Sequence, residues 1–163
     1  MIVAETVSEN KNKGGIFMMP RDTSIDGLTL DEMDIGDKAY IQKTVTEHDI
    51  YTFAGVTGDF NVAHVNEEIA KKNMFGQRIA HGALTSGLIS AVLGMKLPGA
   101  GCLYISQTSK FIRPVKIGDT IKAEAEVIKK IPEKNRVIIK TTCTNQNGDV
   151  VLIGEAEIMP RKK

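Results

Sequence analysis

The sequence predicts a single α+β domain in which an antiparallel sheet wraps around a long central helix. Three observations support this: one long apolar segment of helical character, four strand-like runs, and turn-forming residues between those runs. The chain has 163 residues, of which 42% are hydrophobic. This is enough to bury one ordinary core, but the chain is short for two domains of typical size.

The first regular element expected is a strand over residues 38–45. Its apolar side chains alternate, so that Ala39, Ile41 and Val45 share one face, and Lys43 is the exception on that face. Alternation with period two is typical of a half-buried strand.

Two short helices are expected next, separated by a polar loop. The first begins after Thr46, because Asp49 three residues later resembles a helix start, and it ends near Gly58. Asn66 can cap the second helix, which ends near Asn73.

The central helix is predicted over residues 82–95, which are apolar on nearly every side, as expected of a helix enclosed by other structure. Strand-like runs follow at residues 102–112, 120–131, 136–144 and 150–159. The pair Asn147-Gly148 precedes the last run and predicts a tight hairpin, because both residues tolerate positive φ. These runs should form an antiparallel meander.

Residues 1–27 show no sustained hydrophobic period, so they are expected to form a mobile N-terminal extension. An apolar patch at residues 16–19 could dock on the domain or contact a partner, and the sequence leaves these alternatives open. The domain itself is placed at residues 28–160.

Composition argues against several classes of function. The 21 basic and 20 acidic residues nearly balance, which disfavours nonspecific nucleic-acid binding. Cys102 and Cys143 lie far apart and outside any metal-binding or redox motif. No apolar run approaches the roughly 18 residues of a membrane span, and no secretory signal is recognisable. We therefore expect a cytoplasmic protein without metal or cofactor.

The chemically informative pair is Asp59 and His64, which lie five residues apart in the polar loop. Water is a poor nucleophile, so its addition to an activated alkene needs a base and an acid, and a carboxylate and an imidazole can share these duties. Alternatively, Asp59 and Asn61 only stabilise the loop, and His64 is a helix-flanking residue.

A second cluster lies at the start of the central helix, where His81 precedes Gly82. Unpaired backbone NH groups and the helix dipole stabilise negative charge there, and Gly82 would allow close approach of a substrate. Such donors could form an oxyanion site for a thioester carbonyl. His81 is either a structural residue of the helix end or an acid or base.

The chain resembles the MaoC-like (R)-specific enoyl-CoA hydratase family. Residues 51–64 (Tyr-Thr-Phe-Ala-Gly-Val-Thr-Gly-Asp-Phe-Asn-Val-Ala-His) are similar to the hydratase motif of that family. Further matches are His81-Gly82-Ala83-Leu84, Leu97-Pro98-Gly99 and residues 111–119, in the order that the family shows. The resemblance spans about residues 28–159 and implies a hot-dog fold, a homodimer, and a tunnel for an acyl-CoA thioester.

The resemblance also implies a role for each site residue. Asp59 and His64 would bind one water, Asp59 would take its proton, and the Gly82 NH would polarise the thioester oxygen. Asn61 would shape the loop, and Ser90 would support the site, unless it is only a small core-facing serine. The reversible reaction would give the (3R)-hydroxyacyl-CoA. The family usually has proline where this chain has Val62, which puts the rigidity of the loop in doubt.

Two other functions remain open at this point: a hot-dog acyl-CoA thioesterase and a noncatalytic acyl-CoA-binding module. The sequence does not fix the acyl-chain length, or whether CoA or acyl-carrier protein carries the acyl group. Lys110, Arg113 and Lys116 could contact a nucleotide phosphate, although exposed basic residues are more often solvated.

Overall fold

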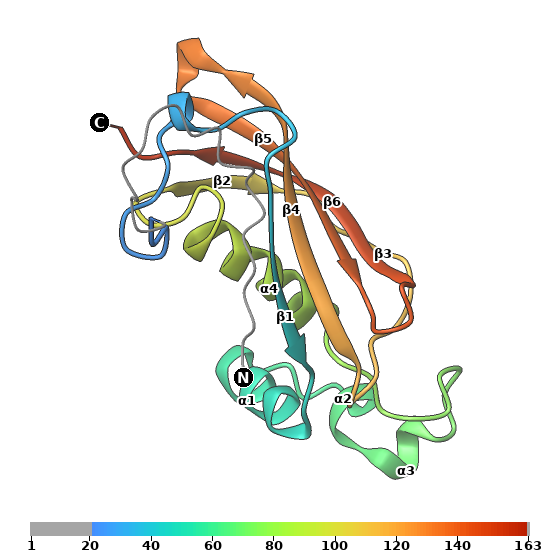
Figure 1. The fold of residues 1–163 in the computed structure, drawn as a ribbon. Helices are drawn as coiled ribbons and strands as arrows, with labels where there is room; N and C mark the ends of the chain where they lie inside the picture. Colours follow the sequence, from blue (N-terminus) through green and yellow to red (C-terminus); the bar gives the residue numbers. More distant parts are fainter. Residues whose placement is uncertain (1–20, 163) are drawn as a thin grey trace.

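A six-stranded antiparallel sheet forms the body of the protein in the computed structural model, which describes residues 21–162 (Figure 1). The strands are β1 (Lys38–Thr44), β2 (Leu103–Gln107), β3 (Lys110–Phe111), β4 (Thr120–Ile131), β5 (Arg136–Thr144) and β6 (Val150–Met159). They are ordered β1-β4-β5-β6-β2, and β3 also pairs with β6. The meander of the last three strands is thereby confirmed.

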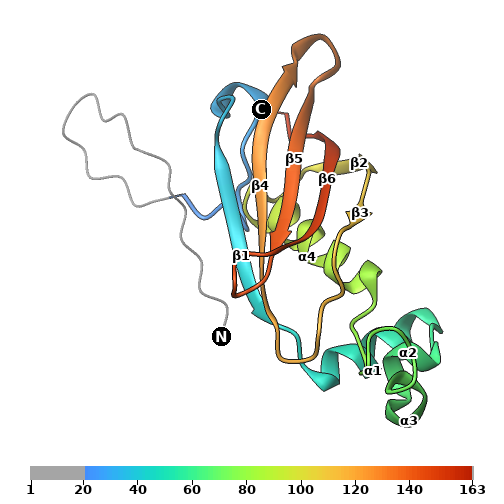
Figure 2. The same ribbon diagram turned by 90° about the vertical axis from the view of Figure 1, so that its right-hand side faces the viewer.

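The helix α4 (Gly82–Met95) lies against one face of this sheet, which curves around it (Figures 1 and 2). Its bounds are those predicted for the central helix. Ile89, Val92 and Leu93 are buried in the same core cluster as Ile121 of β4 and Ile139 of β5. The predicted α+β class and the hot-dog arrangement are therefore confirmed.

The strand expected over residues 102–112 is instead two strands, β2 and β3. The chain crosses close to β6 between them, since a Cβ added to Gly154 would lie 2.0 Å from the carbonyl oxygen of Thr108. The Thr108 hydroxyl accepts a hydrogen bond from the Glu155 NH at 3.1 Å. This side-chain bond breaks the regular backbone ladder, which alternating hydrophobicity could not indicate.

The hairpin between β5 and β6 exists, but it is not the tight Asn-Gly turn that the sequence predicted. Gly148 has a positive φ of 81°, whereas Asn147 is not among the non-glycine residues with positive φ in the described chain. The Asn145 side chain builds a longer loop, because its Oδ1 accepts from the NH groups of Asn147 and Asp149 at 3.0 and 2.9 Å.

Three short helices lie together near one end of the sheet: α1 (Glu47–Thr57), α2 (Val62–Val65) and α3 (Glu67–Ala70) (Figure 1). As predicted, α1 begins after Thr46, whose hydroxyl accepts from the Asp49 NH at 3.3 Å. The Asp49 carboxylate also pairs with Lys43 at 2.9 Å, which explains the cation on the inner face of β1. The helix α2 was not expected, because only a polar loop was predicted between the two helices.

At the other end of the domain, residues 21–33 pack against the segment that follows α4 (Figure 1). The Leu28 NH donates to Pro98 O at 2.7 Å, and the Ala100 NH donates to Thr23 O at 2.8 Å. This part of the chain includes the short 3-10 helix η1 (Leu30–Glu32); a second one, η2 (Pro132–Lys134), joins β4 to β5.

Residues 1–20 of the expected extension lie outside the described residues. The rest of it, residues 21–27, contacts the domain. Within residues 21–162, none of the helices is long and apolar enough to cross a membrane. The cytoplasmic location stays a prediction.

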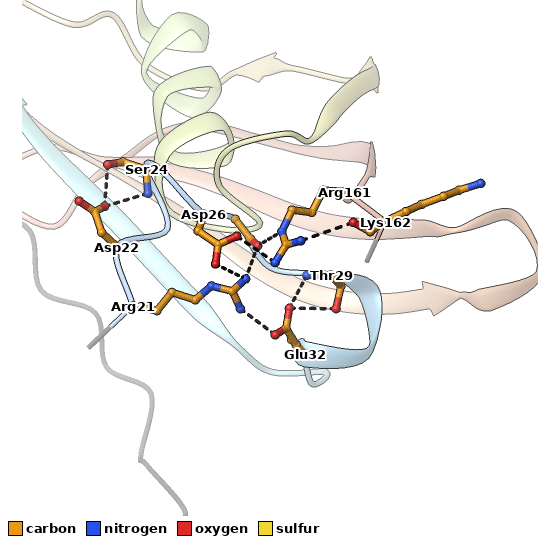
Figure 3. A network of polar contacts seen from close by, with 9 residues as sticks. Arg21, Asp22, Ser24, Asp26, Thr29, Glu32, Arg161 and Lys162 are labelled. Atoms are coloured by element: carbon orange, nitrogen blue, oxygen red, sulfur yellow. Dashed lines mark hydrogen bonds and ion pairs between the residues drawn. The ribbon is translucent and has the colours of Figure 1, made fainter. Parts of the chain in front are cut away.

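Ion pairs fasten the N-terminal segment to the C-terminal residues (Figure 3). Asp26 pairs with Arg21 at 2.8 Å and with Arg161 at 2.9 Å, and Arg21 also pairs with Glu32 at 2.7 Å. Glu32 accepts in addition from the NH and hydroxyl of Thr29 at 2.8 and 2.9 Å. These hydrogen bonds, first from the Thr29 backbone and then from Arg21, lower the pKa of Glu32 to about 2.

We predict that Glu32→Gln lowers the free energy of unfolding by roughly 1 kcal/mol at pH 7, since solvent screens this partly exposed carboxylate. The Glu32 pKa is depressed in the folded state from 4.5 to about 2, so the stabilisation is present above pH 4.5. The difference from wild type should therefore shrink as the pH falls from 4.5 toward 2.

Urea unfolding between pH 7 and pH 3 would measure this difference. Glu133→Gln is the matched control, because Glu133 is exposed and has no hydrogen bond or ion pair among the described residues. A Glu32→Gln variant as stable as this control at pH 7 would contradict the prediction.

Candidate active site

The loop that carries Asp59 is shaped by side-chain to backbone hydrogen bonds. Gly58 ends α1 in the left-handed region with φ 79°. Asp59 Oδ1 then accepts from the Asn61 NH at 3.2 Å, and Asn61 Oδ1 accepts from the Ala63 NH at 3.0 Å. Asn61 is thereby the N-cap of α2, which supports the prediction that it shapes this loop.

His64 lies on α2 and is held by the backbone of the segment that leads into α4. Its Nδ1 lies 2.8 Å from the Ile79 carbonyl oxygen. A carbonyl oxygen only accepts, so Nδ1 is the protonated nitrogen, and in the neutral ring Nε2 keeps its lone pair. The Ile79 NH donates back to Ala63 O at 3.2 Å, so two hydrogen bonds connect the segments.

His81 is the N-cap residue of α4 and is 2% exposed. Its Nε2 lies 3.0 Å from the backbone carbonyl oxygen of Asp59, to which it donates. Its ring packs on the ring of His64 with centroids 3.8 Å apart, and on Phe53 at 4.8 Å. His81 thus joins the Asp59 loop to the start of α4, which favours the structural reading of this residue.

Asp59, His64 and His81 come together, with a ligand atom of each lying within 4.8 Å of the others. One carboxylate and two imidazoles are enough ligands to hold a metal ion. The N-terminal end of α4 beside them carries positive partial charge, however, which favours an anion over a cation. The absence of a metal from the working protein stays a prediction.

A cavity of about 520 Å³ opens beside this cluster. Most of its lining is apolar and includes Phe75, Ile79, Phe111 and Val115. His64 and Gly82 line it as well. Asp59 is not part of the lining, and its carboxylate is exposed next to His64. The cavity can therefore take an apolar chain whose polar end reaches the cluster.

Gly82 is the first residue of α4, so its NH is one of the groups without a partner inside the helix. A Cβ at this position would lie 2.9 Å from Cε1 of Phe111, whose ring lines the same cavity. A larger residue here would therefore push the Phe111 ring out of its place. An electronegative atom in the cavity can approach this NH as it would an oxyanion site.

Ser90 lies apart from the cluster, two helical turns beyond Ala83 on α4, and does not line the cavity. It is exposed, so the alternative of a core-facing serine is wrong. Its supporting role stays a prediction.

The three basic residues considered for phosphate contact do not all lie together. Arg113 lines the cavity, pairs with Asp149 at 3.0 Å and shares a second hollow with Lys116. Lys110 lines a different hollow.

Sequence reasoning missed three features of the site: the Ile79 carbonyl, the bond from His81 to Asp59, and the Phe111 ring over Gly82. A main-chain acceptor has no residue-type signature, so Ile79 could not be found from the sequence. Phe111 lies in one of the segments quoted for the resemblance, which was the available signal for that residue.

Comparison with known proteins identifies the domain. Residues 33–147 match the family model described as the MaoC like domain. An (R)-specific enoyl-CoA hydratase of Rhodospirillum rubrum is 49% identical over 139 residues, 83% of this chain and 96% of the relative. A 3-hydroxybutyryl-CoA dehydratase of Methylorubrum extorquens is 44% identical over 136 residues, 83% of this chain and 86% of that protein.

A solved structure agrees with these sequence relatives. R-hydratase PhaJ1 from Pseudomonas aeruginosa in the unliganded form superposes with a TM-score of 0.80 at 44% identity, covering 84% of this chain and 88% of the other.

We predict that Gly82→Ala lowers kcat/KM for a thioester substrate by about 10–100-fold, because the methyl group crowds Phe111 and obstructs the NH donor. Gly94→Ala is the control, since a Cβ at Gly94 meets nothing within 4 Å on the same helix. Alanine there should slightly favour the helix. Steady-state kinetics on the two purified variants tests this, and equal kcat/KM for both would contradict it.

Proposed function

Because the chain belongs to the MaoC-like domain family, we propose that it is an (R)-specific hydratase that adds water to the double bond of a trans-2-enoyl-CoA. One observation carries the proposal. The Asp59 carboxylate and the His64 nitrogen that keeps its lone pair lie close together, beside both an apolar cavity and a helix N-terminus. The names of the relatives at 49% and 44% identity support a CoA thioester and a reversible reaction.

Asp59 and His64 hold and activate the water in this proposal. One water hydrogen points to the Asp59 carboxylate and the other to His64 Nε2, which is an acceptor because Nδ1 donates to Ile79 O. As the water oxygen bonds to C3, Asp59 takes the first hydrogen as a proton. The second hydrogen stays on the new hydroxyl group.

The electrons of the double bond move toward the thioester oxygen, which becomes enolate-like. The Gly82 NH at the start of α4 donates to that oxygen and stabilises the charge where it develops. When the enolate collapses, C2 takes a proton from Asp59, which restores the carboxylate. One water has then been added, and no cofactor is consumed.

Absorbance and thiol assays with crotonyl-CoA test the activity. Loss of the enoyl-thioester absorbance without release of free CoA is the expected result, and chiral analysis should show the (3R) product. Release of thiol would indicate the alternative thioesterase. Binding of crotonyl-CoA without turnover, measured by calorimetry, would favour the noncatalytic acyl-CoA-binding module.

We predict that Asp59→Asn and His64→Gln each lower kcat by at least about 100-fold, because each removes a group that handles the water. Both side chains are at least partly exposed, so the folded state should persist in circular dichroism. Asp34→Asn and His48→Gln are matched controls at exposed positions, and they should keep wild-type kcat. Normal turnover by both folded site variants would exclude this mechanism.

We further propose that two copies of the chain associate through β2, as a homodimer acting in fatty-acid metabolism. The strand β2 lies at the edge of the sheet and exposes Leu103, Tyr104 and Ile105 on both of its faces. An exposed apolar edge strand favours pairing with another chain. A second copy would also cover the exposed side of α4, where Ser90 lies.

We predict that light scattering gives twice the chain mass of 17.8 kDa for wild type and a smaller mass for Ile105→Arg. The introduced arginine would be buried opposite the same arginine of the second copy, and the repulsion between the two charges would weaken the dimer. Ile35→Arg, at a position that is 67% exposed and distant from β2 in sequence, is the control and should leave the mass unchanged. A monomeric wild type would overturn the dimer without affecting the hydration mechanism.

A further inference from the structure

Arg78 lies outside the cluster and has no role in the hydration steps, yet its side chain is only 14% exposed. Its guanidinium contacts Glu47 at 2.5 Å and Glu67 at 3.0 Å. It also donates to the Tyr51 hydroxyl at 3.2 Å and lies over the Tyr51 ring, 5.9 Å from the centroid. One side chain therefore connects α1, α3 and the segment leading into α4.

These contacts use the planar geometry of the guanidinium. Its Nε and both terminal nitrogens each have a separate partner, and a lysine ammonium could not reach all three in these directions. Removing the cation would leave two carboxylates near each other without the charge that holds them together. The Glu47 hydrogen bond raises the pKa of Arg78 further, so the cation persists at any working pH.

The position of Arg78 in the chain connects this clamp to the site. The next residue is Ile79, whose carbonyl oxygen accepts from His64 Nδ1 and whose NH donates to Ala63 O. His64 itself lies on α2, between the two helices that Arg78 joins. Arg78 thus contacts the helices before and after α2 and directly precedes the residue that accepts the His64 hydrogen bond.

We propose that Arg78 is a positioning residue that fixes the direction of the Ile79 carbonyl and, through it, the tautomer and orientation of His64. The consequence for activity rests on the proposed hydratase function. The consequence for the imidazole does not, because the tautomer can be observed in the protein without substrate. Partners that orient metal-binding histidines typically change affinity or activity by about 10–100-fold when they are removed, and we expect the same range for this histidine.

Nitrogen-15 NMR of the histidine rings is the first experiment. At a pH where the ring is neutral, wild type should show His64 in a single tautomer with the proton on Nδ1, assigned by loss of the signal in His64→Gln. In Arg78→Gln, His64 should move toward a mixture of tautomers. In Arg78→Lys, which keeps the charge and one carboxylate contact, the Nδ1 proton should largely be retained.

Kinetics on crotonyl-CoA forms the second arm. Arg78→Gln should lower kcat by about 10–100-fold and change KM by less than about 3-fold, since Arg78 does not line the cavity. Arg78→Lys should recover most of this loss. Arg136→Gln is the matched control, because Arg136 is a partly buried arginine paired with Glu157 at 3.3 Å on β5 and β6.

The two arms have separate meanings. An unchanged His64 tautomer in Arg78→Gln overturns the proposal, whatever happens to turnover. A similar loss of kcat in Arg136→Gln also overturns it, because the effect would then be general destabilisation. If wild type hydrates neither crotonyl-CoA nor a longer trans-2-enoyl-CoA, the proposed function fails, and the NMR arm still decides whether Arg78 orients His64.

Discussion

The enclosure of α4 by the sheet is the constraint on which the rest of the structure depends. Ile89, Val92 and Leu93 are at most 1% exposed, and each buried side chain of this size contributes about 1.5–3 kcal/mol. This burial fixes where the helix begins. His81 and Gly82 therefore have a definite position, and the loop with Asp59 and His64 needs only short hydrogen bonds to reach it.

The site itself contributes little apolar burial, so its order comes from polar contacts. Asp59 is exposed and His64 only partly buried, whereas His81 is buried with its Nδ1 unpartnered among the described residues. A buried acceptor without a donor costs about 1–3 kcal/mol. The burial of apolar side chains around α4 can offset this cost. A local cost of this kind is typical of a site that serves chemistry more than stability.

The sequence could predict α4, β4, β5 and β6 because each is long and has a regular hydrophobic pattern. It could not predict α2, which is four residues long and depends on the Asn61 cap, or the break before β3, which depends on the close approach at Gly154. Asp59, His64 and Gly82 were accessible because their residue types carry chemistry. The partners that orient them are backbone atoms or residues far along the chain.

Val62 shows how such contacts can replace a conformational restraint. It occupies the first position of α2, where proline is favoured because its fixed φ suits a helix start. Valine lacks that restraint, but the residues around it are bonded: Asn61 caps the turn, the His64 NH donates to Asn61 O at 2.9 Å, and Ala63 O accepts from Ile79. The order of the loop therefore rests on hydrogen bonds to the segment before α4, and it should depend on that segment more than on the residue at position 62.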